Sequence, residues 1–202
     1  MDTFKQVQTA YDQMVLEYAK RNHFNMADNL IALAQELILH IGQNGHIVEV
    51  GCGTGRDMSW FEAQGSIITG IDLSMGMLTY ARKQVRGDLV SMNMRYLGFC
   101  NGYFDGAWCC ASLLHLPKTE AVYTLQEIRR ILKSGGMLIL SIQKGIGEDW
   151  EDSYVPDIKR FFARYQLDEM RNILSNNGFS IRNANSSQEV NREWLSFVCI
   201  AE

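Results

Sequence analysis

The stretch Ile47-Val48-Glu49-Val50-Gly51-Cys52-Gly53-Thr54-Gly55-Arg56-Asp57 decides the fold of this chain. Its first residues form a short apolar run typical of a strand, and a helical pattern begins at Arg56. The three glycines between them lack Cβ atoms, so the backbone can turn sharply there and a ligand can approach it closely. Free N–H groups at the start of the helix favour an anionic group. The stretch therefore predicts a strand, a turn and a helix, with a ligand site at the turn.

The spacing within this turn distinguishes between ligands. A dinucleotide fingerprint reads G-x-G-x-x-G, and Arg56 stands where its third glycine would be. The pattern is instead Glu-x-Gly-x-Gly-x-Gly, with the Glu49 carboxylate just ahead of the turn. An acidic residue gives no advantage to a pyrophosphate site, whereas it could orient a cationic group such as the ammonium of a sulfonium cofactor. We therefore expect a ligand with a cationic amino-acid end.

The chain beyond this stretch alternates between strand and helix patterns. Because the strand runs are short and mostly apolar, they are typical of a parallel sheet with helices on both faces. Right-handed crossovers then give a doubly wound α/β fold whose ligand crevice lies at the carboxyl ends of the strands. The expected strands are Ile47–Val50, Ile67–Ile71, Leu89–Val90, Ala107–Cys110 and Met137–Ile142, and the expected helices between them are Arg56–Ala63, Met75–Val85 and Thr119–Leu132.

The two ends of the chain break this alternation. Apolar periodicity predicts amphipathic helices at about Phe4–Arg21 and Ala27–Ile41 before the first strand. Near the other end, a helix face containing Leu167 and Leu174 is followed by two strand candidates, Phe179–Asn185 and Trp194–Ala201, with no helix between them. We expect these two strands to form an antiparallel hairpin that closes one edge of the sheet.

Composition narrows the class of protein. A chain of 202 residues with 47% hydrophobic residues and no internal repeat suits one globular domain. The net charge of −4 gives no electrostatic reason to bind nucleic acid or an anionic membrane. No apolar run is long enough to span a bilayer, and the N-terminus lacks the layout of a secretion signal. Five cysteines without metal-ligand spacing predict buried, reduced thiols, no metal and a cytoplasmic location.

Two further segments suggest an adenosine site. Asp72 ends a strand 21 residues after Gly51, where a carboxylate can accept hydrogen bonds from both ribose hydroxyls. Asp72 could instead cap the next helix, and both roles hold if Ser74 is the cap. After the third strand, the Asn93 side chain and the Met94 N–H could contact the adenine edge.

These motifs, in this order, resemble the class I S-adenosylmethionine-dependent methyltransferases, in particular the small bacterial group that acts on small molecules. The resemblance runs through VEVGCGTGRDMSWF, ITGIDLSMGMLTYAR, FDGAWCCASLLHLPK and EIRRILKSGGMLILSI, and continues to REWLSFVCIAE, so it covers most of residues 45–202. It implies a Rossmann-like sheet of seven strands, mostly parallel, with an antiparallel last strand. It also implies S-adenosylmethionine as cofactor, S-adenosylhomocysteine as product and a small-molecule acceptor, and it says little about which acceptor.

The resemblance assigns roles to individual residues. Two departures from the family pattern are Asn93, where Asp is more usual, and Ser134, where Pro is usual. The amide oxygen of Asn93 can still accept a hydrogen bond, so the adenine contact is weakened and not lost. The residues expected to bind the cofactor are Glu49, Gly51, Cys52, Gly53, Gly55, Asp72, Leu73, Met77, Asn93, Met94, Cys110 and Ala111.

The acceptor site is less well defined. His115 follows the fourth strand and is the best candidate for a catalytic base, although a histidine in a leucine-rich loop is more often structural. The polar, aromatic segment 144–164 follows the fifth strand, where a lid over the acceptor is expected. Its acidic residues could favour a cationic acceptor, but a solvated loop explains them more simply. The candidates for the acceptor site are Tyr11, Tyr18, Trp150, Tyr154, Arg160, Tyr165, Arg192 and Trp194.

We therefore expect one methyltransferase domain with three parts: an N-terminal helical cap (residues 1–44), a cofactor-binding core (45–143), and an acceptor lid with the closing hairpin (144–202). The main alternative is a sensor or partner subunit that binds S-adenosylmethionine without catalysis. A nicotinamide-dependent oxidoreductase is disfavoured by Glu49 and the glycine spacing. A nucleic-acid or protein methylase is disfavoured because a basic face and an Asn-Pro-Pro-aromatic motif are absent. The oligomeric state cannot be deduced.

Overall fold

The computed structural model describes residues 3–22, 26–42, 44–189 and 191–202. Its centre is a seven-stranded sheet in the order β3-β2-β1-β4-β5-β9-β8. All neighbours among the first five of these strands pair in parallel, and β9 is antiparallel to both β5 and β8. These pairings confirm the mostly parallel, doubly wound sheet and its antiparallel C-terminal hairpin. The strands of this sheet are β1 His46–Val50, β2 Ile67–Asp72, β3 Asp88–Ser91, β4 Phe104–Cys110, β5 Leu132–Gln143, β8 Phe179–Glu189 and β9 Arg192–Ala201.

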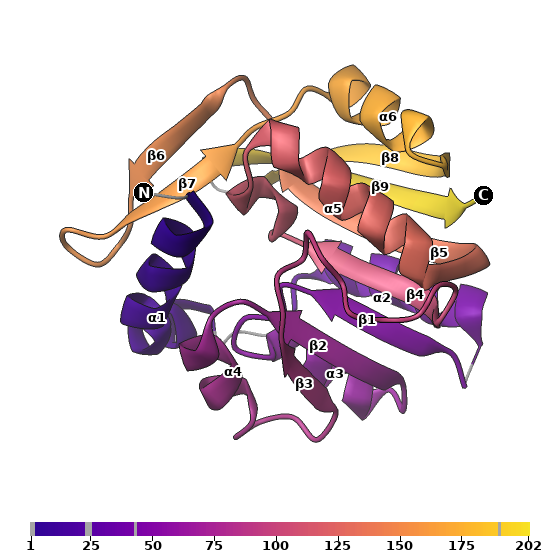
Figure 1. Ribbon diagram of the computed structural model, residues 1–202, viewed down its shortest axis with the longest axis horizontal. Coiled ribbons are helices and arrows are strands. Elements are labelled where there is room, and N and C mark those ends of the chain that lie inside the picture. The colour runs from indigo at the N-terminus through magenta and orange to yellow at the C-terminus, as the bar shows by residue number, and fades with distance from the viewer. Residues whose placement is uncertain (1–2, 23–25, 43, 190) are drawn as a thin grey trace.

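Helices cover both faces of the sheet (Figure 1). On one face, α2, α3 and α4 pack against the sheet around Leu37, Phe61 and Leu78. On the other face, α5 and α6 pack around Leu125 and Leu174. The helices are α1 Thr3–Asn22, α2 Asp28–Ile41, α3 Arg56–Ala63, α4 Met75–Ala81, α5 Lys118–Ile131 and α6 Leu167–Asn176, with a single 3-10 turn, η1 Leu113–His115. None of the helices in the described residues is both long enough and apolar enough to cross a membrane.

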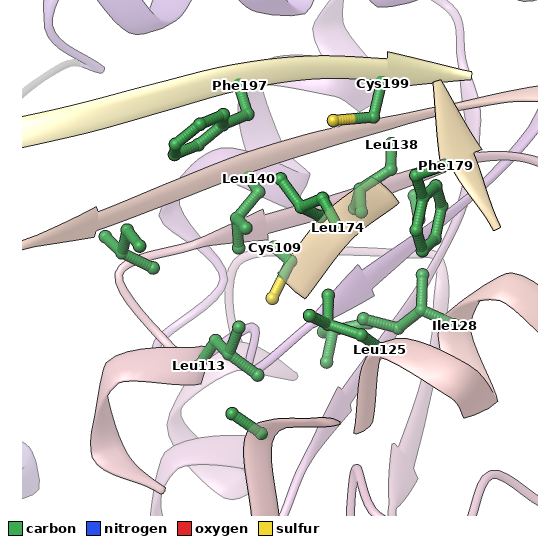
Figure 2. Packing of buried hydrophobic residues seen from close by; sticks show 14 of the residues in the cluster. Cys109, Leu113, Leu125, Ile128, Leu138, Leu140, Leu174, Phe179, Phe197 and Cys199 are labelled. Atoms are coloured by element: carbon green, nitrogen blue, oxygen red, sulfur yellow. The ribbon is translucent and has the colours of Figure 1, made fainter. Parts of the chain in front are cut away.

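The core beneath α5 and α6 is built from strand residues that point toward the helices. Figure 2 shows Leu138 and Leu140 of β5 on the side of the strand that faces Leu125 and Ile128 of α5, with Phe197 of β9 near Leu140. All five side chains are essentially inaccessible to water. Because β5 lies between β4 and β9, its side chains hold the parallel half of the sheet against the C-terminal hairpin.

The lid segment contains regular structure that the sequence analysis did not anticipate. Two short strands, β6 Glu148–Asp152 and β7 Lys159–Ala163, form an antiparallel hairpin outside the main sheet. Figure 1 shows this β6–β7 hairpin at the same end of the molecule as α1, and α1 contacts β7 directly. The hairpin was missed because its first strand is strongly polar and lacks the apolar alternation on which the prediction of strands relied.

Helix α1 is fixed across the carboxyl end of the sheet by polar contacts with α4. The Asp12 carboxylate accepts hydrogen bonds from Ser74 Oγ at 2.5 Å and from Gly76 N at 2.9 Å. One turn earlier, Gln8 Nε2 donates to the carbonyl of Leu73 at 3.0 Å. These bonds set the position of the helix face that carries Tyr11 and Tyr18.

The cysteines depart partly from the expectation of buried thiols. Cys109 and Cys110 do face opposite sides of β4: Cys109 belongs to the core under α5, and Cys110 packs against the other core. Cys110 is only partly buried, however, and Cys100 is exposed. Cys100 lies in the loop before β4, at the surface of the molecule.

Removing most of a buried side chain at the centre of β5 should destabilise the fold strongly. We expect Leu140→Ala to lower the free energy of unfolding by about 2–5 kcal/mol, because Leu140 is fully buried and its loss leaves a cavity. Urea unfolding monitored by circular dichroism measures this change. The matched control is Leu39→Ala on α2, where the leucine is 85% exposed and the change should stay within about 0.5 kcal/mol. Equal effects of the two substitutions would contradict the packing described here.

Candidate functional site

Two adjoining clefts lie at the carboxyl ends of the central strands, beneath α1. The first, called the narrow cleft, has an empty volume of about 720 Å³ including its mouth. The second, the wide cleft, has about 1310 Å³ and extends toward the β6–β7 hairpin. Both volumes are sufficient for a small organic ligand. The residues that line both clefts, and so mark their junction, are Tyr11, Tyr18, Gly51, Gly53, Ala111 and His115.

The turn after β1 forms the floor of this junction. Gly51 has φ +80°, and a Cβ atom there would lie 2.4 Å from Cβ of Ser112, so any side chain would both strain the backbone and collide. Ser112 is itself held by a 2.5 Å hydrogen bond from its hydroxyl to the carbonyl of Val50. Ala111, just before it, adopts φ +54°, which is uncommon for a residue other than glycine. The segments that follow β1 and β4 are therefore in direct contact, with no side chain at position 51 between them.

Asp72 ends β2 at the wall of the narrow cleft. Its carboxylate accepts hydrogen bonds from Gly53 N and Ser74 N, both at 2.8 Å. Burial raises the pKa of Asp72, and these N–H donors counteract part of that rise. Ser74 is the N-cap of α4 and accepts from Met77 N, as the sequence suggested, so Asp72 is not needed as the cap. Asp72 therefore contributes to the wall of the narrow cleft and also holds the glycine turn in place through Gly53 N.

Glu49 is a buried carboxylate that lines the wide cleft. It is 5% exposed, and its Oε2 has no hydrogen-bond partner. Burial raises the pKa of Glu49 well above its ordinary value, and the nearby Asp57 carboxylate raises it further. Asp57 is better satisfied, because it accepts from Arg56 Nε at 2.6 Å and from Trp108 Nε1 at 2.9 Å. An unpartnered buried carboxylate oxygen facing a cleft favours a ligand that brings a hydrogen-bond donor or a positive charge.

Tyr11 and His115 form a hydrogen-bonded pair at the junction of the clefts. His115 Nδ1 lies 2.7 Å from the carbonyl of Phe161 and must donate to it, so Nε2 is the nitrogen that accepts from the Tyr11 hydroxyl at 2.6 Å. Burial lowers the pKa of His115 to about 4. Burial also raises the pKa of Tyr11 far above its ordinary value. At neutral pH the pair is therefore uncharged, and each group fixes the orientation of the other.

The structure brings together most of the residues predicted from the sequence. Among the candidates for the acceptor site, Tyr154, Arg160, Arg192 and Trp194 line the wide cleft, and Tyr11 and Tyr18 line both clefts. Among the cofactor candidates, Leu73, Met77, Asn93 and Met94 line the narrow cleft with Asp72, and Cys52 and Cys110 line the wide cleft with Glu49.

Three predicted residues lie elsewhere. Gly55 lines neither cleft, and a Cβ atom there would press on Ala81 and Val85 at 3.1 Å, so this glycine permits the close packing of α3 and α4. Trp150 packs against Phe161 with ring centroids 5.5 Å apart, and Tyr165 is fully buried in the core under α5.

Strand alternation explains the positions of these side chains. Trp150 is paired with Phe161, and Glu151 with Arg160, across the β6–β7 hairpin. Because neighbouring residues of a strand face opposite sides, the side that includes Arg160 and Phe162 faces the wide cleft, and the side that includes Phe161 packs into the core.

Some lining residues were not anticipated from the sequence. Phe4, Val7 and Gln8 of α1 line the narrow cleft, as do Met92 and Ser112. The spacing of Phe4, Val7, Tyr11 and Tyr18 was a signal for one helix face, but it could not reveal which surface that face covers. Asn93 also differs from expectation in detail, because its side-chain oxygen already accepts from Arg95 N at 3.1 Å.

Comparison with known proteins agrees with this architecture. Residues 48–140 match the family model described as a methyltransferase domain. The chain is 32% identical over 123 residues to the protein YqeM of Bacillus subtilis (strain 168). It is 31% identical over 150 residues to demethylmenaquinone methyltransferase of Symbiobacterium thermophilum. These matches cover 57% and 66% of this chain, and 50% and 57% of those proteins, so the chain spans about half the length of the curated relatives it matches.

A solved structure extends the likeness to the whole fold. Magnesium protoporphyrin IX methyltransferase from Synechocystis PCC 6803, crystallised with bound S-adenosylmethionine, superposes with a TM-score of 0.79 at 16% identity and covers 100% of this chain and 98% of that chain. The strand order and the glycine turn after β1 agree with the match of residues 48–140 to a methyltransferase domain. Residues 48–140 are therefore similar to the methyltransferase-domain family, and the chain as a whole shares the fold of a solved methyltransferase.

Proposed function

We propose that this chain binds S-adenosylmethionine across the two clefts and transfers its methyl group to a small-molecule acceptor. The observation that carries the proposal is the unpartnered, buried Oε2 of Glu49 beside a glycine turn in which Gly53 N donates to Asp72. A cationic ammonium and a ribose are the groups that these two carboxylates suit, and S-adenosylmethionine carries both. The solved structure from Synechocystis holds this cofactor, which supports the same assignment here.

The narrow cleft suits the adenosine part of the cofactor. Asp72 would accept hydrogen bonds from the ribose hydroxyls, because a carboxylate has enough lone pairs to serve them as well as its two backbone donors. Leu73 and Met77 supply apolar walls for a flat ring, and Asn93 and Met94 lie where its polar edge would be read. Since the Asn93 oxygen already accepts from Arg95 N, the backbone N–H of Met94 is the simpler donor to a ring nitrogen.

The amino-acid end of the cofactor would lie in the wide cleft, next to the glycine turn. Glu49 would bind its ammonium, and an ammonium placed there would supply the donor that Oε2 lacks. Because Gly51 and Gly53 have no side chains, the backbone there can approach the ligand closely. Cys110 and Ala111, at the end of β4, also line this cleft. When bound, the cofactor supplies an electrophilic sulfonium methyl group, so the protein is left to orient the acceptor and exclude water.

Tyr11 and His115 stand where the two clefts meet, which is where the sulfonium would lie between adenosine and amino-acid end. Because the pKa of His115 is lowered to about 4, its imidazole is neutral at pH 7. The single ring proton is on Nδ1, which donates to the carbonyl of Phe161, and Nε2 carries no proton. The geometry favours a positioning role for His115, through the Tyr11 hydroxyl, over the role of catalytic base predicted from the sequence. Tyr11 and Tyr18 would then close α1 over the bound cofactor.

We propose the same division of the single domain as the sequence suggested. Residues 1–44 act as a cap that covers the clefts, 45–143 form the cofactor-binding core, and 144–202 form the acceptor lid and the closing hairpin. The contacts of Asp12 with Ser74 and Gly76, and of α1 with β7, support this division, because they join the first segment to elements of the other two.

Loss of the Asp72 carboxylate should reduce cofactor-induced stabilisation. At 100 times its dissociation constant, S-adenosylmethionine or S-adenosylhomocysteine stabilises the fold by about 2.7 kcal/mol, which is about 5–10 °C for a chain of this size. In Asp72→Ala we expect a dissociation constant at least about tenfold higher, because two charge-assisted hydrogen bonds are lost. Thermal-shift titration measures both values, with the surface variant Asp168→Ala as the control and NAD as the ligand that should give no shift. If neither sulfur compound shifts the melting temperature at millimolar concentration, the cofactor assignment fails.

Glu49→Gln should separate stability from cofactor binding. Because the pKa of Glu49 is raised in the folded state, its contribution to stability is lost as pH rises above its ordinary value of 4.5. A glutamine cannot ionise, so the ligand-free variant should be more stable than the wild type at pH 7.5, and this difference should shrink toward pH 5. Urea unfolding at the two pH values tests this.

The same variant should bind S-adenosylmethionine at least about tenfold more weakly, since it lacks the charge that pairs with the ammonium. Its affinity for 5′-methylthioadenosine, which has no amino-acid end, should stay within about twofold of the wild type. Equal losses for both ligands would place Glu49 away from the ammonium and contradict the proposed orientation.

A further inference from the structure

Arg160 differs from the other arginines of the wide cleft. Arg21 is paired with Glu17, Arg56 with Asp57 and Arg192 with Glu151. Within residues 3–22, 26–42, 44–189 and 191–202, Arg160 has no carboxylate within ion-pair distance, and its buried Nε has no hydrogen-bond partner. A guanidinium is always charged, so this side chain places an uncompensated positive charge in the cleft.

The carboxylate that would be expected to pair with Arg160 is engaged elsewhere. Glu151 is the direct cross-strand neighbour of Arg160 in the β6–β7 hairpin, a position where opposite charges normally attract each other. Instead, one Glu151 oxygen contacts Arg164 and the other lies 3.0 Å from Arg192 Nη2. Two arginines thus share the Glu151 carboxylate, and Arg160 is left without a counter-charge.

The surroundings of Arg160 hold it in place without neutralising it. Its guanidinium lies 5.0 Å from the ring centroid of Tyr154 and 5.1 Å from that of Phe162. Tyr11 lines the same cleft, at its junction with the narrow cleft. Aromatic rings orient a cation and partly stabilise it, but they leave donors of the guanidinium fork unused.

Arg192 adds a second positive charge to the same part of the cleft. Its guanidinium lies 5.0 Å from the centroid of Phe162, the ring that Arg160 also contacts. Burial lowers the pKa of Arg192, and the charge of Arg160 lowers it further. The same two charges also help to keep His115 neutral. Two like charges so close together favour an anion between or beside them.

The carboxylates that line the wide cleft do not cancel this charge. Asp57 is bound by Arg56 and Trp108. Glu49 lies at the glycine turn, where its burial favours the protonated form until a cation binds. Glu189 is exposed and accepts a hydrogen bond from Asn29 at 3.0 Å. The end of the cleft formed by the β6–β7 hairpin therefore remains positive.

We propose that the acceptor carries a carboxylate, that Arg160 binds this carboxylate, and that the aromatic rings of Tyr154, Phe162 and Trp194 contact the apolar part of the acceptor. This inference rests on the proposed methyl transfer and names the chemical class of its acceptor. The guanidinium fork of Arg160 matches the planar geometry of a carboxylate. Arg160 lines the wide cleft together with Tyr11 and His115 of the junction, so a bound acid would share a cleft with the point where the methyl group would be presented. The acidic residues of segment 144–164 do not support a cationic acceptor, because Glu151 is consumed by arginines and Glu148, Asp149 and Asp152 are exposed.

The cofactor also carries a carboxylate, on its methionine part, to which Arg160 could bind. The experiment must therefore distinguish the carboxylate of the acceptor from that of the cofactor. We would saturate the protein with S-adenosylhomocysteine and titrate it calorimetrically with benzoate, phenylacetate, indole-3-acetate and succinate, each compared with its uncharged amide. At least one acid should bind tenfold or more tightly than its amide. Arg160→Gln should remove that preference, Arg160→Lys should keep part of it, and Arg182→Gln, an exposed arginine on β8, should leave it within twofold.

The cofactor arm of the experiment uses S-adenosylhomocysteine and 5′-methylthioadenosine with the same variants. Arg160→Gln should bind both within threefold of the wild type, which also shows that the variant is folded. If Arg160→Gln weakens S-adenosylhomocysteine tenfold while 5′-methylthioadenosine is unaffected, Arg160 holds the cofactor carboxylate and the inference is wrong. If no acid in the panel is preferred over its amide by the wild type, the inference also fails, although cofactor binding stands. If S-adenosylhomocysteine itself does not bind, the proposed function fails first.

Discussion

The contact between the turns that follow β1 and β4 is the constraint on which the rest of the site depends. Ser112 donates to the carbonyl of Val50, and its Cβ occupies the space that a side chain at position 51 would need. Because only glycine fits there, the ends of two neighbouring parallel strands approach without an intervening side chain. The narrow cleft opens on one side of this contact and the wide cleft on the other. Glu49, Asp72 and the Tyr11–His115 pair are all positioned relative to it.

The parallel half of the sheet was predictable from the sequence because local and tertiary signals agree there. The helix Arg56–Ala63 was predicted with the bounds that the structure shows, and β1 and β2 differ from prediction by one residue at one end. Glycine turns and mostly apolar runs mark these elements directly. By contrast, β5 begins at Leu132, five residues earlier than expected. Its first residues include Lys133, Ser134 and two glycines, which do not show the composition of a strand.

The site was predictable where it follows strand ends and less so where it depends on the packing of separate elements. Glu49, Asp72 and Asn93 each stand at or near the end of a strand, so the order of motifs in the sequence placed them correctly around the clefts. Trp150 and Tyr165 were expected to face an acceptor because the lid was taken as a loop. Once the β6–β7 hairpin is known, strand alternation assigns Trp150 to the core side and Arg160 to the cleft side. The position of α1 depends on Asp12 and Gln8 reaching α4, and a single sequence does not reveal such long-range hydrogen bonds.

The order of the strands also leaves β3 and β8 at the two edges of the sheet. An exposed edge offers unpaired backbone groups to any other extended chain and is a common starting point for aggregation. Here β3 is only four residues long, and β8 carries a register shift between Ile181 and Asn183 and mostly polar, exposed side chains. A short strand gives little length for pairing, and an irregular one does not match a regular partner. The chain can therefore keep a largely apolar sheet in its interior while giving neighbouring molecules no smooth edge on which to add a strand.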